Sequence, residues 1–180
     1  MERQYGLKGT GIALPVAAVY TIATFGSVYG GWLPMNLIKN NWPVFKARKT
    51  SMFIYALCVI PIVFVQIAGG INMWYAVIVI GIAASAHQAW SANIFTTVSD
   101  MFPKNSVGSV TGIGGMFGAL GGVLFSWLVQ KKLFAYYGPK GIDKIEVAYY
   151  IMFFVCGSAY LLAWFIMHLL TRKMKAVELN

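Results

Sequence analysis

Five long apolar runs constrain this sequence more than any other feature, because each is long enough to cross a bilayer. A membrane-spanning helix needs about 20 mostly apolar residues, and its backbone must satisfy its own hydrogen bonds in lipid. The alternating pattern that is typical of membrane β-barrel strands is absent from the sequence. We therefore expect an all-α membrane protein that forms a single transmembrane bundle over residues 1–180. The predicted spans cover residues 11–33, 50–68, 72–97, 107–129 and 147–170.

The composition agrees with a membrane protein and excludes several function classes. Only 11% of the residues are charged and 59% are hydrophobic, whereas soluble domains carry about 25% charged residues. The formal charge of +9 comes from residues that flank the apolar runs, where they act as orientation signals and contact lipid headgroups. No nucleic-acid partner is therefore expected. Cys58 and Cys156 lie inside apolar runs without metal-ligand spacing, and no paired carboxylates or nucleophile–base arrangement appears. We expect no metal, no cofactor and no enzyme activity.

The distribution of basic residues predicts how the chain is oriented. The segment 34–50 carries four basic residues and no acid, so it should be cytoplasmic. Strict alternation of the spans then places the C-terminus in the cytoplasm and the N-terminus outside. A short charged N-terminus would then cross the membrane unaided, which suggests that the chain is truncated at its start. We expect a multi-pass protein of the inner (plasma) membrane.

A cluster of polar residues interrupts the third apolar run and is the first candidate for a site. It consists of His87, Gln88, Trp90, Ser91 and Asn93. At about 100° per residue, His87, Trp90 and Ser91 share one helix face, Gln88 lies at its edge, and Asn93 points elsewhere.

Polar groups inside a membrane are a functional-site hypothesis. Trp90 offers a flat surface for the C–H face of a sugar ring, and Gln88 and Ser91 can bond hydroxyls or a carboxylate. The alternative is hydrogen bonding between helices, which is favoured for Asn93. Three roles remain open for His87: it could donate to a ligand, carry a proton or form a buried hydrogen bond.

Two other runs carry features at helical spacing. In the first run Tyr20 and Thr24 share a face that serves either packing or a cavity wall. The fourth run is dense in glycine, and small residues let membrane helices approach closely. We expect helix packing there at Gly108, Gly112, Gly118 and Gly122. The fifth run has no concentrated polar face and is expected to face lipid. All five acidic residues are expected in loops or tails.

Several motifs together resemble one known family, the major facilitator superfamily. They are the runs 86–93 (Ala-His-Gln-Ala-Trp-Ser-Ala-Asn), 98–103 (Val-Ser-Asp-Met-Phe-Pro), 107–116, 30–34 (Gly-Gly-Trp-Leu-Pro) and 47–50 (Ala-Arg-Lys-Thr). The pattern is most similar to the anion:cation symporter branch, which includes hexuronate and other sugar-acid transporters. The resemblance implies that the five spans correspond to the eighth through twelfth helices of a twelve-helix carrier. The N-terminal six-helix bundle and the seventh helix would be missing.

The resemblance also implies an activity. It implies proton-coupled symport of an organic anion by alternating access, with Trp90 aligned to a site aromatic and Gln88 and Ser91 beside it. The family's coupling carboxylate and anchoring arginine lie in the missing half. The family's loop motif has an Asp after Gly-x-Leu, where this chain has Pro34 and Met35, so a charge relay at that loop is not implied. The alternative function is a small structural or assembly subunit of a membrane complex.

Overall fold

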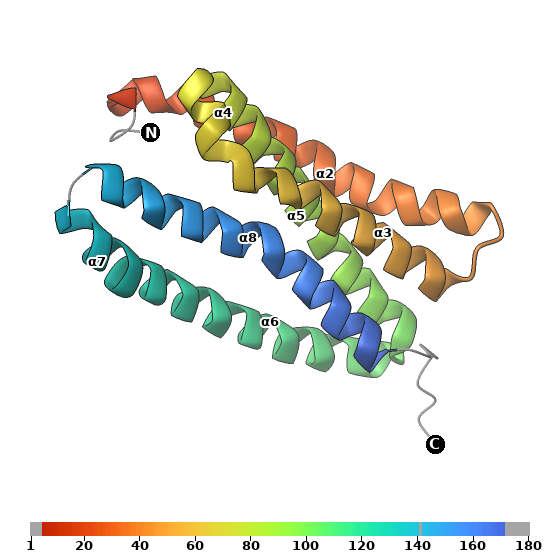
Figure 1. Cartoon of the computed structure of the whole chain (residues 1–180). Helices are drawn as coiled ribbons and strands as arrows, with labels where there is room; N and C mark the ends of the chain where they lie inside the picture. The colour runs from red at the N-terminus through yellow and green to blue at the C-terminus, as the bar shows by residue number, and fades with distance from the viewer. Residues whose placement is uncertain (1–4, 141, 172–180) are drawn as a thin grey trace.

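The computed structural model describes residues 5–140 and 142–171, and within these ranges it consists of helices joined by short connections. Five helical segments are long and apolar enough to cross a membrane, which confirms the predicted all-α membrane fold. They cover Gly9–Lys39, Val44–Ile71, Met73–Met101, Lys104–Tyr137 and Ile145–Leu170. Within them the α-helices are α2 (Ala13–Lys39), α3 (Val44–Val59), α4 (Val65–Ile71), α5 (Met73–Met101), α6 (Lys104–Leu128), α7 (Ala135–Tyr137) and α8 (Ile142–Leu170) (Figure 1).

Four short 3-10 or π-helical segments accompany the α-helices in the described residues. The 3-10 segments are η1 (Gly9–Ile12), η2 (Ile60–Phe64) and η4 (Gly138–Lys140), and η3 (Val129–Phe134) is a π-helical stretch. The segment η2 breaks the second span at Pro61, which has no N–H to continue an α-helix. The 3-10 turn satisfies the freed group locally, because the Ile60 N–H donates to the Leu57 carbonyl.

The connections are shorter than the sequence predicted. The predicted loop 34–50 is mostly helical, because α2 continues through Pro34 to Lys39 and α3 begins just after Pro43. Asp100, predicted in a loop, lies in the last turn of α5. At about 1.5 Å per residue, α2 and α5 are longer than the roughly 30 Å hydrocarbon core. Their polar ends therefore extend into the interfacial region as helix.

The helix α5 is the centre of the bundle and packs against α2, α3 and α4. The main core cluster joins α3 to α5 through Met52, Tyr55, Ala56, Ala89 and Trp90. Figure 1 shows α6 at the edge of the molecule, followed through α7 by a return along α8. None of the residues of α6 is buried, so the bundle has a tightly packed half and an open half.

Candidate functional site

The contact between α2 and α5 is close enough to require glycine. A Cβ at Gly26 would overlap the Ser85 backbone of α5, and one at Gly30 would lie 2.6 Å from the Ala89 Cα. Tight backbone approach of this kind drives helix association in lipid. The same contact fixes the rotation of α5, and therefore the direction in which its polar residues point.

Asn93 bonds α5 to α2 inside this contact. Its Nδ2 donates to the Gly30 carbonyl at 2.7 Å and to the Ala89 carbonyl at 3.0 Å, and the side chain is fully buried. The Gly30 carbonyl needs this donor because Pro34, four residues later, has no N–H to give it. Neighbouring helices commonly satisfy groups that a proline frees in a membrane helix. Asn93 thus supplies a hydrogen bond that α2 cannot make for itself.

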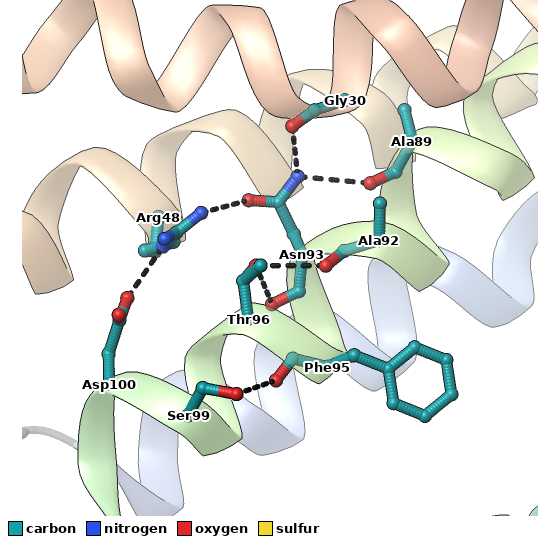
Figure 2. A network of polar contacts seen from close by, with 9 residues as sticks. All are labelled: Gly30, Arg48, Ala89, Ala92, Asn93, Phe95, Thr96, Ser99 and Asp100. Atoms are coloured by element: carbon teal, nitrogen blue, oxygen red, sulfur yellow. Dashed lines mark hydrogen bonds and ion pairs between the residues drawn. The ribbon is translucent and has the colours of Figure 1, made fainter.

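The polar network continues from Asn93 to the end of α5, as Figure 2 shows. The Arg48 guanidinium of α3 donates to the Asn93 Oδ1 at 3.5 Å through Nη1 and to the Asp100 Oδ2 at 2.8 Å through Nε. Arg48 and Asp100 therefore form an ion pair whose side chains are 14% and 30% exposed. This pair is not predictable from hydropathy, which places both residues in loops. Three helices, α2, α3 and α5, are tied together at one end.

A second polar contact joins α5 to α8 near the middle of both helices. The His87 Nδ1 and the Tyr160 hydroxyl are 2.5 Å apart. The Tyr160 ring also meets Trp90 edge-on, with ring centroids 5.4 Å apart. Tyr160 was not singled out in the sequence, and α8 is not purely lipid-facing, because Trp164 also donates to the Lys49 carbonyl of α3 at 2.9 Å.

The predicted binding residues differ in how accessible they are. Trp90 is only 6% exposed, lying in the core cluster behind Tyr160. Gln88 is exposed and Ser91 is half-buried. Neither side chain has a hydrogen-bond partner among the described residues, so both can bond a ligand.

Tyr20 and Gln88 point to the same side of the α2–α5 pair. Tyr55 of α3 donates to the Tyr29 carbonyl and stacks edge-on against the Tyr29 ring, so Tyr29 faces α3. Tyr20 lies nine residues earlier, which is half a turn out of phase, and it is 71% exposed. Gln88 is likewise about 200° from Trp90, which packs on α3. Both side chains therefore lie on the side of the α2–α5 pair that faces away from α3.

Thr24 lies on the exposed part of α2, and its hydroxyl donates to the Tyr20 carbonyl at 2.9 Å. No hydrogen bond joins Thr24 to the α5 cluster among the residues that the structure describes. The fold thus places the α2 and α5 candidates on one side of the bundle without bringing them into contact. A ligand that used both sets would have to bridge them.

The glycines predicted to pack in α6 have open space beside them among the described residues. A Cβ at Gly108, Gly112, Gly118 or Gly122 would meet no atom within 4 Å. Close packing through this helix therefore stays a prediction, and a partner for it would lie outside the residues described. Within those residues, no group of three or more His, Cys, Asp or Glu side chains could hold a metal ion.

The fold and the site together define a polytopic α-helical membrane protein with a polar face on its central span. No protein-family model matches the chain, and no solved structure matches it. Two curated relatives do: the hexuronate transporters of Escherichia coli strain K12 and of Escherichia coli O157:H7 are each 30% identical to it over 129 residues. The match covers 72% of this chain and 30% of the length of each relative. The expected similarity to hexuronate transporters of the major facilitator type is confirmed.

Proposed function

We propose that this chain forms part of a proton-coupled carrier that moves a small organic anion, such as a hexuronate or another sugar acid, by alternating access. The observation that carries the proposal is the similarity to the two hexuronate transporters. Because the match covers 30% of each relative's length, we also propose that helices outside this chain, including an N-terminal bundle, supply the opposite wall of the binding site. Substrate sites in such carriers lie near the midplane, between two bundles.

The side of the α2–α5 pair that faces away from α3 is the wall that we assign to the substrate. Gln88 and Ser91 would bond its hydroxyls and carboxylate, and Tyr20 and Thr24 would approach it from α2. His87 lies near the middle of α5, and an imidazole is the side chain best suited to exchange a proton near neutral pH. Trp90 would hold the Tyr160 ring in place beside His87. It would contact the sugar only when the helices around it move apart.

The location follows from the same proposal. We place the chain in the inner (plasma) membrane with its C-terminal end in the cytoplasm, because the segment 34–50 is basic and free of acids. The Arg48–Asp100 ion pair would then lie at the cytoplasmic face.

A chimera tests the function directly. The matched segment of the Escherichia coli K12 hexuronate transporter is replaced with this chain, and uptake of radiolabelled glucuronate is measured in cells that lack the native transporter. We expect uptake, and we expect Gln88→Ala to reduce it about tenfold or more, as for a lost hydrogen bond to a charged group.

Ser99→Ala is the matched control. Ser99 is exposed on nearly the same face of α5 as Gln88, but it lies about 16 Å further along the helix. It should leave uptake unchanged. A chimera that reaches the membrane in normal amounts and takes up no sugar acid contradicts the proposal.

The alternative of an assembly subunit draws on one observation, the uncovered glycine-rich face of α6. It predicts that the chain purifies in mild detergent with a stable, unrelated membrane protein and binds no sugar acid. Co-purification with such a protein, together with failure of the chimera, would favour it over a carrier.

A further inference from the structure

Tyr160 of α8 is the side chain that joins both core clusters of the bundle to His87. Its ring packs against the cluster that contains Trp90 and against the cluster that contains Val59. The ring meets Trp90 edge-on at 5.4 Å and the His87 imidazole edge-on at 6.0 Å, measured between ring centroids. The hydroxyl lies 2.5 Å from the His87 Nδ1. The groups that hold Tyr160 in place thus lie on α3 and α5, not on the uncovered helix α6.

A close approach between α8 and η2 fixes the direction in which Tyr160 points. A Cβ at Gly157 would lie 2.7 Å from the Val63 Cγ2, so any side chain at this position would displace Val63. Gly157 lies three residues before Tyr160, which is less than one turn of α8. The contact that sets the rotation of α8 is therefore next to the residue that reaches His87.

The surroundings of the His87–Tyr160 pair are apolar. The pair borders a cavity of about 410 Å³ to which α3, η2, α5 and α6 contribute apolar side chains, apart from His87 itself. Helix α8 adds one other titratable neighbour, the Cys156 thiol. No acidic or basic side chain among the described residues lines this cavity apart from His87. The state of the imidazole is therefore set mainly by the hydroxyl that it contacts.

The hydroxyl is the donor in this hydrogen bond while His87 is neutral. A tyrosine hydroxyl ionises only near a pH of about 10, so it keeps its hydrogen at neutral pH. Within the described residues, the only acceptor of the Tyr160 hydroxyl is the His87 Nδ1. The opposite assignment, with Nδ1–H donating to the oxygen, would leave the hydroxyl hydrogen without an acceptor in apolar surroundings, which costs free energy.

This direction determines where His87 can bind a proton. A neutral imidazole carries hydrogen on one ring nitrogen and accepts at the other, so His87 carries its hydrogen on Nε2 when Nδ1 accepts. The free lone pair of the ring is then at Nδ1, and an added proton forms its N–H bond there. The imidazole gains one positive charge, Nδ1–H becomes the donor, and the Tyr160 oxygen becomes the acceptor. Proton uptake reverses the hydrogen bond between α5 and α8 without breaking it.

We propose that Tyr160 is the positioning residue of His87: it fixes the Nε2–H tautomer, so that the proton exchanged during transport binds at Nδ1, in the contact between α5 and α8. Its role in proton exchange rests on the proposed function, in which His87 takes up and releases the proton. The tautomer itself does not depend on transport and can be measured on the chain alone.

NMR of the imidazole nitrogens in the full chain tests the tautomer. The chain has two histidines, so a His168→Gln background assigns the signals of His87. The nitrogen shifts separate a ring nitrogen that carries hydrogen from one that does not. We expect Tyr160→Phe to lower the ratio of the Nε2–H to the Nδ1–H tautomer about fivefold, as for one hydrogen bond of ordinary strength. An unchanged ratio, or a dominant Nδ1–H tautomer in the unsubstituted Tyr160 chain, overturns the proposal.

Tyr149→Phe is the matched control. Tyr149 lies 11 residues before Tyr160, so it occupies nearly the same face of α8 about 16 Å away. Its ring packs edge-on against Phe134. Both variants keep the aromatic ring and remove only a hydroxyl, so neither leaves a large cavity. Tyr149→Phe should leave the tautomer ratio of His87 unchanged, and an equal change in both variants overturns the proposal.

Uptake by the hexuronate-transporter chimera separates this role from the proposed function. An acidic outside should stimulate uptake of glucuronate, and Tyr160→Phe should lose most of that stimulation while Tyr149→Phe keeps it. Full stimulation in Tyr160→Phe overturns the role of Tyr160 in proton exchange. If the tautomer ratio responds to Tyr160→Phe but the chimera takes up nothing, the proposed function fails and the tautomer assignment is supported. If the chimera transports and the ratio does not respond, the positioning role alone fails.

Discussion

The two halves of this bundle use different means to hold their helices together. In the half formed by α2, α3 and α5, backbones touch at Gly26 and Gly30, and a buried asparagine joins the helices. In the half that contains α6, no residue of that helix is buried and apolar cavities lie beside it, although α8 itself packs on α3 and η2. The first half is therefore closely packed, whereas α6 is left uncovered by the described residues.

The largest effect is expected from a side chain forced into the α2–α5 contact. Gly26→Leu would overlap the Ser85 backbone, and overpacking typically costs about 1–3 kcal/mol or more. We expect loss of the monodisperse peak in size-exclusion chromatography. The matched change in the open half is Gly112→Leu. A Cβ at Gly112 meets no atom within 4 Å, so this variant should behave like the wild type. Equal damage from both variants would remove the distinction between the halves.

The next effect tests the hydrogen bond between Asn93 and the carbonyl that Pro34 leaves free. Asn93→Leu should lower stability by about 1–2 kcal/mol, since bonds between membrane helices contribute about 0.6 kcal/mol each, up to about 1.7. Pro34→Ala restores an N–H to α2, so Asn93→Leu should cost less in that background. Unfolding in mixed micelles, measured as a double-mutant cycle, gives the coupling. Simple additivity would show that the two residues act separately.

A smaller effect is expected from the ion pair at the end of the packed half. Arg48→Gln and Asp100→Asn should show a coupling of about 0.2–1 kcal/mol, because the pair is partly exposed. The coupling should fall in high salt. The same unfolding assay at two salt concentrations measures it, and a coupling that does not respond to salt would mean that the charges do not interact.

The smallest effect is expected in the open half. Tyr160→Phe removes the hydroxyl that meets His87 and should cost about 0.6 kcal/mol, while the ring packing on Trp90 is kept. If this change destabilises the protein more than Asn93→Leu does, the open half is the more tightly held of the two. The comparison would then be reversed.

The sequence predicted the fold well because span length and apolarity are local properties that lipid enforces. The structure has five candidate spans within the described residues, as the sequence predicts. Contacts that depend on tertiary packing were not predictable in the same way. Tyr160 looked like one aromatic among many, and its role depends on the rotation of α8 that brings it to His87.

The ends of the helices were also mispredicted, for a physical reason. Hydropathy falls where Arg48 and Asp100 occur, so both looked like loop residues, although their backbones continue the helices. Pairing across α3 and α5 is what makes such polar ends tolerable as helix. The candidate site stays a prediction: Gln88 is exposed in the described residues, and the helices that would face it belong to the proposed carrier.

Pro61 and Pro34, which both lie inside spans, have different consequences for biosynthesis. At Pro61 the chain satisfies the freed carbonyl with its own 3-10 turn, so that span is complete as soon as it forms. At Pro34 the Gly30 carbonyl is bonded by side chains of two later helices instead: the Tyr55 hydroxyl of α3 donates to it at 3.4 Å and the Asn93 Nδ2 of α5 donates to it at 2.7 Å. The first span therefore depends on residues that are 25 and 63 positions later in the chain for hydrogen bonds that its own backbone cannot make.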